Sequence, residues 1–170
     1  MLKKKIYFSI VFTLFLSSLS VNAEETFTRH FAENAQISMK IPTGWIIETA
    51  KDKYGVFDAR DTHVFRYIIV SDEYFDRGNL DTRFQRFLDG ISIYDNNYEI
   101  IDTGTAMLGK HPSKWVIHSR YYDEKHIKSL NHIVVIDNHE YIIGGFSLAE
   151  KFDEHKPLLE RIIESSQIEK

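Results

Sequence analysis

The fold of this chain is decided by the stretch Ile37-Ser38-Met39-Lys40-Ile41-Pro42-Thr43-Gly44-Trp45. Apolar and polar side chains alternate in it as far as Ile41, and a period of two predicts a strand with one buried face. Pro42 lacks the N–H that a strand ladder needs and Gly44 permits a positive φ, so we expect a turn there. Trp45 begins a new extended segment, and we expect its ring to pack into the core rather than to stack on a ligand.

Further strands are expected on both sides of this stretch. Residues 24–34 are a loose lead-in or a first edge strand. Downstream, runs rich in β-branched and aromatic residues alternate with turn residues and predict strands over Tyr54–Arg60, His63–Ser71, Tyr98–Leu108, Lys114–Tyr122, His126–Ile136 and Glu140–Ser147. Residues 133–136 and 141–143 are apolar on both faces, so their strands should lie centrally in the sheet.

Two segments have helical rather than strand periodicity. One face of a helix is formed by Leu80, Phe84, Phe87, Leu88 and Ile91, with Asn79 or Asp81 as its N-cap. A second amphipathic helix is expected over Phe152–Ile168. Hairpin-length connections imply antiparallel strands, and two amphipathic helices need a sheet to cover, so the fold class is α+β, an antiparallel sheet flanked by helices.

The Pro-x-Gly-Trp corner at residues 42–45 and the final strand that leads into the terminal helix resemble the PsbP-like superfamily. This superfamily includes PsbP, the Ran-binding Mog proteins and DcrB-like bacterial exported proteins. The resemblance follows the element order of the chain from residue 24 onward. It implies an α/β/α sandwich that serves mostly as a non-catalytic binding or assembly module. The partner-contacting N-terminal extension of the photosystem members has no clear match here, so a photosynthetic role is not expected.

The first 23 residues have the three parts of a secretory signal peptide. Lys3–Lys5 form a positive region, Ile6–Leu16 are mainly apolar, and Val21 and Ala23 are small enough for signal peptidase. The apolar run is shorter than the roughly 20 residues of a spanning helix, so cleavage after Ala23 is favoured over an uncleaved anchor. We therefore expect a single domain at 24–170, periplasmic or secreted, with no membrane span after cleavage.

The composition excludes several chemistries. The 170 residues contain no cysteine, so disulfides, thiolate metal sites, cysteine nucleophiles and lipid anchoring through an N-terminal cysteine are ruled out. The net charge is −4, and the predicted signal peptide carries three lysines and no acid, so the remaining chain is more acidic still. Lys110, Lys114 and Arg120 lie near aromatic residues, but against this acidic background we expect a solvated strand face and no nucleic acid partner.

Five of the eight histidines fall on the strands between residues 111 and 139: His111, His118, His126, His132 and His139. A turn at Asp123-Glu124 would place His118 opposite Ser129, on the other face from His126 and His132. Metal sites need imidazoles that converge within a few ångströms, and no HxH or HExxH spacing occurs. We therefore expect no metal and no cofactor.

Other catalytic patterns are weak. Ser147 follows a strand as in a hydrolase nucleophile elbow, but Ala149 replaces the second glycine of that motif and Asp153 and His155 are too close in sequence to complete a triad. Carboxylates that gather near strand ends are expected to be solvated. These are Asp58, Asp61, Asp72, Glu73 and Asp76.

The sequence therefore predicts an exported, non-enzymatic binding or assembly protein with no catalytic residues, whose partner is a protein of the cell envelope. Two alternatives stay open at this stage. One is an envelope hydrolase or metal-binding protein that uses the histidine-rich strands at 111–139. The other is a carrier of a small apolar ligand held between sheet and helix.

Overall fold

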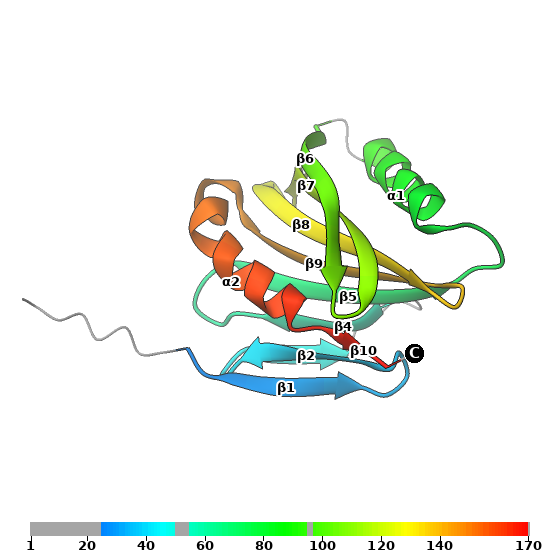
Figure 1. The fold of residues 1–170 in the computed structure, drawn as a ribbon. Coiled ribbons are helices and arrows are strands. Elements are labelled where there is room, and N and C mark those ends of the chain that lie inside the picture. Colours follow the sequence, from blue (N-terminus) through cyan, green and yellow to red (C-terminus); the bar gives the residue numbers. More distant parts are fainter. Residues whose placement is uncertain (1–24, 50–54, 95–96, 170) are drawn as a thin grey trace, which may run out of the picture.

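Strand pairing organises the molecule, which we describe from a computed structural model covering residues 25–49, 55–94 and 97–169. The predicted signal peptide at 1–23 lies outside the described residues. The elements that the structure describes follow the chain in this order (Figure 1): β1 (Phe27–Ala32), β2 (Ile37–Pro42), β3 (Ile46–Thr49), β4 (Gly55–Arg60), β5 (Arg66–Tyr74), α1 (Leu80–Tyr94), β6 (Glu99–Leu108), β7 (His111–Tyr122), β8 (Lys125–Ile136), β9 (His139–Leu148), the short 3-10 helix η1 (Ala149–Lys151), α2 (Phe152–Glu164) and β10 (Gln167–Ile168).

The larger sheet has the antiparallel order β3-β4-β5-β9-β8-β7-β6. The predicted central position of the strands at 133–136 and 141–143 is confirmed, because β8 and β9 are both interior. The predicted hairpin turn is confirmed as well. Tyr122 pairs with Lys125, and Asp123 and Glu124 between them have positive φ angles of 48° and 61°. This register places His118 opposite Ser129, as the sequence predicted.

The second sheet has three strands in the order β1-β2-β10. The alternation at 37–41 is a strand, and Gly44 beyond it has a φ of 93°. The expected helix over Phe152–Ile168 is wrong at its end, because it stops at Glu164 and Ile168 pairs with Ile37 in the sheet. Ser165 Oγ donates to the Ile162 carbonyl at 2.6 Å and accepts from Lys40 N–H at 2.7 Å, which offers the backbone an alternative to the helix.

The two faces of the seven-stranded sheet are covered very differently. One face carries the main core, to which α2, β2 and the buried sides of β4, β5, β8 and β9 all contribute. The other face is covered by α1 alone among the described elements (Figure 1). There the buried cluster is small. Phe84 of α1 packs on Val116 and Ile133, and Leu80, Phe87 and Leu88 of the predicted helix face pack around these three residues. α1 packs mainly on β7 and β8 and reaches β5 and β9 through Arg83, so much of this face over β4, β5 and β9 stays open.

The start of α1 is fixed by two separate devices. Asn79 is the N-cap, because its Oδ1 accepts from Thr82 N–H at 3.0 Å while its own N–H donates to Thr82 Oγ1 at 2.8 Å. Of the two predicted caps, Asn79 is therefore the one used. Lys114 of β7 also forms an ion pair with Asp81. No helix within the described ranges has the length and apolar character needed to cross a bilayer.

Candidate binding trough beside helix α1

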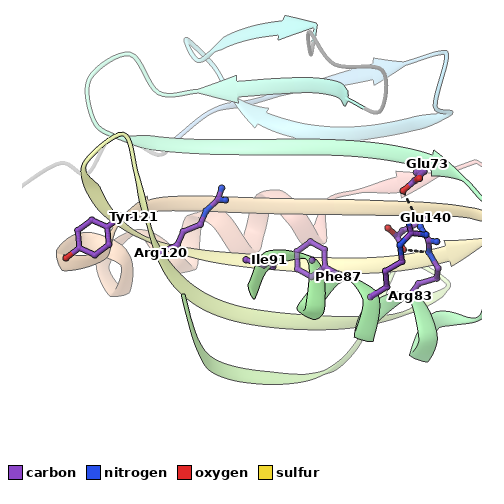
Figure 2. Close-up of a pocket in the computed structure, with 9 residues that line it drawn as sticks. Glu73, Arg83, Phe87, Ile91, Arg120, Tyr121 and Glu140 are labelled. Carbon is purple, nitrogen blue, oxygen red and sulfur yellow. Dashed lines mark hydrogen bonds and ion pairs between the residues drawn. The ribbon is translucent and has the colours of Figure 1, made fainter. Parts of the chain in front are cut away.

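The open part of the sheet face beside α1 is hollowed by three adjoining cavities of about 560, 190 and 170 Å³. All three are lined by Arg120, and they share further residues in pairs, so we treat them as one site and call it the α1 trough. Figure 2 shows its long axis, with Arg83 and Glu140 at one end and Arg120 and Tyr121 at the other. The largest cavity alone falls within the range typical of small-ligand sites.

The floor of the α1 trough is apolar over β5 and β9, and Glu48, Asp58 and Arg60 border it on the side of β3 and β4. Tyr67 of β5 and Phe146 of β9 pair across the strands, and their rings stack with centroids 4.8 Å apart and an interplanar angle of 3°. Ile69 lies two residues along β5 and is 39 % exposed although it sits near the middle of the sheet. Phe87 and Ile91 of α1 form the wall. An exposed isoleucine on an interior strand marks a surface that the fold itself leaves uncovered.

One end of the trough holds a buried ion group. Arg83 of α1 is 4 % exposed, and its Nε donates to Glu140 Oε2 of β9 at 2.5 Å. Its Nη2 donates to Glu73 Oε2 of β5 at 3.3 Å, and the guanidinium lies 4.2 Å from the centroid of the Phe75 ring. Every charge in the group faces an opposite charge. The group therefore ties the start of α1 to the sheet and leaves little capacity for a ligand.

Near the other end, three polar atoms are buried and lack a hydrogen-bond partner: Tyr98 Oη, His118 Nδ1 and Arg120 Nε. His118 and Arg120 line the trough, and Tyr98 lies beside His118. The Tyr98 and His118 rings lie 5.0 Å apart, and the positive charge of Arg120 acts on both. We call these three residues the donor cluster. Burial, aided by the charge of Arg120, lowers the pKa of His118 to about 4, so its ring is neutral near pH 7.

The tautomer of His118 follows from its neighbour. Asn131 Nδ2 lies 2.8 Å from His118 Nε2. An amide nitrogen only donates, so Nε2 accepts and the proton of the neutral ring sits on Nδ1. Asn131 can take this position because residue 144 beneath it is glycine: a Cβ there would lie 2.0 Å from Asn131 Oδ1. All three unpartnered atoms of the donor cluster therefore carry a hydrogen to donate.

The remaining histidines do not meet at a common point. Within the ranges that the structure describes, no group of three histidine, aspartate or glutamate side chains is placed to hold a metal ion. His118 faces the α1 trough, whereas His132 faces α2, as the register predicted. His139 Nδ1 lies 2.7 Å from Asp72 Oδ1, and the His126 ring stacks on Tyr121 at 5.1 Å.

One serine–histidine pair occurs on the α2 face. Ser113 Oγ lies 3.2 Å from His132 Nδ1, and Glu160 of α2 acts on the histidine from the far side of a 200 Å³ cavity. Burial lowers the pKa of His132 to about 4 despite that carboxylate. Ser113 is only 1 % exposed and does not line the cavity, so a substrate has no path to its hydroxyl.

The other weak catalytic patterns have structural partners. Ser147 is fully buried and its Oγ donates to the Leu148 carbonyl at 3.3 Å. Among the clustered carboxylates, Asp61 accepts from Arg66 and from the His63 N–H, which together hold its pKa below the usual value although burial opposes them. Trp45 packs against the main core with Arg66 over its ring, at 5.6 Å.

The α1 trough is not predicted by the sequence. The sequence indicates Arg120 only as a basic residue near aromatics, and His118 only as one of five histidines on the strands. The signal that was available is the strand register, which puts Arg120 and His118 on the face of β7 that α1 covers. What the register does not contain is how far α1 extends over that face, and this decides whether the arginine is solvated or enclosed.

Comparisons with known proteins identify the fold. No family model matches the sequence, and no curated protein does. Solved structures do match in three dimensions, and the chain has a PsbP-like fold, as the sequence resemblance implied. The α+β class with an antiparallel sheet between helices is likewise confirmed.

Three matches illustrate the likeness. Cyanobacterial PsbP (CyanoP) from Synechocystis sp. PCC 6803 superposes with a TM-score of 0.66 at 14 % identity, covering 90 % of this chain and 98 % of its own. LpqN, described as involved in cell envelope biogenesis of Mycobacterium tuberculosis, gives 0.59 at 14 % identity, covering 85 % and 91 %. The Saccharomyces cerevisiae Ran-binding protein Mog1p gives 0.59 at 11 % identity, covering 85 % and 96 %. At these identities the likeness concerns the fold.

Proposed function

We propose that this protein is an exported, non-enzymatic binding protein whose partner is a protein of the cell envelope. Export rests on the three-part pattern of residues 1–23. Binding rather than catalysis is supported by the α1 trough, which is open and has an apolar floor. Among the described residues that line it, the one histidine, His118, is neutral and held by Asn131. LpqN has this fold and is described as acting in envelope biogenesis, and Mog1p is described as Ran-binding, so the fold serves protein partners elsewhere.

The observation that carries the proposal is the aromatic rim of the trough. Tyr121 and Tyr122 end the long strand β7 and are 53 % and 52 % exposed, although each lines a cavity of the trough. Half-exposed tyrosines beside a concave apolar surface are typical of the anchor residues of protein interfaces, since they bury much area at a low entropic cost. A partner seated on this rim would cover the exposed floor as well.

The test is capture from envelope extracts after mild crosslinking, with wild type and the double variant Tyr121→Ser/Tyr122→Ser. The matched control is Phe31→Ser, since Phe31 is 51 % exposed but lies on the three-stranded sheet. We expect a reproducible partner that the wild type and the control retain and the rim variant loses. A partner that the rim variant retains fully, or no reproducible partner at all, would refute the proposal. Export is checked separately by sequencing the N-terminus of the protein from the periplasm and medium, which should begin at Glu24.

The alternative of an envelope hydrolase is favoured by one observation, the 3.2 Å distance between Ser113 Oγ and His132 Nδ1. If this pair were catalytic, purified protein would hydrolyse p-nitrophenyl acetate above the buffer rate and Ser113→Ala would abolish that activity. We expect no such difference, because both side chains are buried. The metal-binding alternative is tested by elemental analysis of protein purified without a histidine tag, where stoichiometric zinc or copper would support it.

A further inference from the structure

The donor cluster presents three hydrogen-bond donors that lack a partner. Tyr98 Oη, His118 Nδ1 and Arg120 Nε are each buried without a partner, and His118 as a whole is 3 % exposed. A buried donor that is left unpaired destabilises a fold, so three of them in neighbouring side chains are unusual. The arginine adds a positive charge, and its Nε is buried without a partner. Donors plus a positive charge complement an anionic oxygen.

The donor cluster borders a mainly apolar cavity, whereas Glu48, Asp58 and Arg60 line the adjoining cavity that Arg120 also reaches. His118 and Arg120 line the same 190 Å³ cavity as Ile69, Phe87 and Phe146. A fully hydrated anion such as phosphate would gain nothing from these side chains. An acid with an apolar body would place its charged end at the donors and cover the exposed isoleucine and the stacked rings with the remainder.

We propose that the α1 trough binds a small apolar monocarboxylic acid, with its carboxylate at His118 and Arg120 and its apolar body on the floor formed by Tyr67, Ile69 and Phe146. The Arg120 guanidinium supplies the charge-assisted hydrogen bond, and His118 Nδ1–H supplies a neutral one. The class is a monoacid, because at the far end of the trough Glu73 and Glu140 would repel a second carboxylate.

This inference extends the proposed function by adding a small ligand to the trough whose rim holds the protein partner. The two can fail separately. Partner capture is read in extracts with the rim variant, whereas ligand binding is read on purified protein with variants of the donor cluster.

The test is isothermal titration calorimetry of purified protein with sodium decanoate below its micellar concentration, and with decan-1-ol as an uncharged analogue of the same chain length. We expect saturable one-to-one binding of decanoate and at least tenfold weaker binding of the alcohol, since a hydrogen bond to a charged group is worth about tenfold or more in affinity. Equal affinity for acid and alcohol, or no binding of decanoate, overturns the proposal. This comparison needs no variant.

Arg120→Gln, which keeps the bulk of the side chain, should weaken decanoate binding about tenfold. The matched control is Arg77→Gln, because Arg77 is exposed before α1 and lines none of the three cavities of the trough. An equal loss in both variants would indicate attraction by general charge and would overturn the assignment to Arg120. Far-ultraviolet circular dichroism confirms that each variant is folded.

A last titration distinguishes a small acid from a peptide C-terminus as the ligand, because a C-terminus also has a carboxylate. An acetylated pentapeptide that ends in Leu-Phe is titrated with a free and with an amidated C-terminus. Tighter binding of the free-acid peptide than of decanoate, lost on amidation, would overturn the small-acid proposal in favour of a peptide ligand. Weaker binding supports it.

Discussion

Replacing Arg83 by methionine tests whether the buried ion group holds α1 on the sheet. Both Arg83 and Glu140 are nearly inaccessible, with side-chain exposures of 4 % and 6 %, and they are joined at 2.5 Å. Removing the arginine leaves the Glu140 carboxylate buried without its partner, and breaking a buried pair in this way costs about 3–5 kcal/mol. At about 2–4 °C per kcal/mol for a domain of this size, the melting temperature should fall by roughly 6–20 °C.

Urea unfolding followed by circular dichroism measures the loss, and the double variant Arg83→Met/Glu140→Leu shows its cause. Replacing both partners by apolar residues is often neutral, so the double variant should recover most of the lost free energy of unfolding. The control is Arg60→Met. Arg60 pairs with Glu48 at 3.3 Å, but both side chains are about half exposed, and such pairs contribute about 0–1 kcal/mol. A loss below about 1 kcal/mol for Arg83→Met, or a double variant as unstable as the sum of the single variants, would refute the reasoning.

Three further predictions concern the stability of the fold around the trough, the N-cap of α1 and two buried histidines. Gly144→Ala should cost about 1–3 kcal/mol in urea unfolding, because the new Cβ displaces Asn131 from His118, and most of that cost should vanish in an Asn131→Ala background. Asn79→Ala should cost about 1 kcal/mol, whereas Asp81→Ala should not show a capping loss. The pKa values of His118 and His132 are both lowered to about 4 by burial, so the unfolded chain binds more protons than the folded one between pH 6.5 and 4. Stability should therefore be complete above pH 6.5 and decline toward pH 4, by up to about 3 kcal/mol per histidine, and His118→Gln and His132→Gln should each flatten that decline.

The strand register was predictable because it depends on short-range patterns. Asp123-Glu124 forms a two-residue turn, and once that turn is fixed every pair between β7 and β8 follows, including His118 with Ser129. The face of α1 was predictable for the same reason, since Leu80 to Ile91 repeat with helical spacing. Asn79 could be suggested as a cap from its place before the first apolar residue, but choosing it over Asp81 required the bond to Thr82.

The features that the sequence did not predict depend on contacts between distant segments. Helical periodicity continues through Ser166 to Ile168, yet Lys40 donates to Ser165 Oγ and Ile37 pairs with Ile168, so the terminal residues join a sheet built 125 residues earlier. The donor cluster is a second case. Tyr98 lies directly before β6, and His118 and Arg120 are ordinary strand residues by composition. Their burial depends on segments that are far apart in the sequence.

The uneven cover of the large sheet traces back to the turn at Pro42–Trp45. This turn carries the chain from β2 in the small sheet to β3 at the edge of the large one, and the small sheet comes to lie on the face that α2 also covers. The small sheet and α2 then share one face of the large sheet, while α1, with its 15 residues, is the only described helix on the other face. A helix of that length spans about 22 Å and covers two or three strands of a seven-stranded sheet. An open surface beside α1 therefore follows from the topology itself, and the particular residues at 69, 118, 120 and 146 decide what that surface can bind.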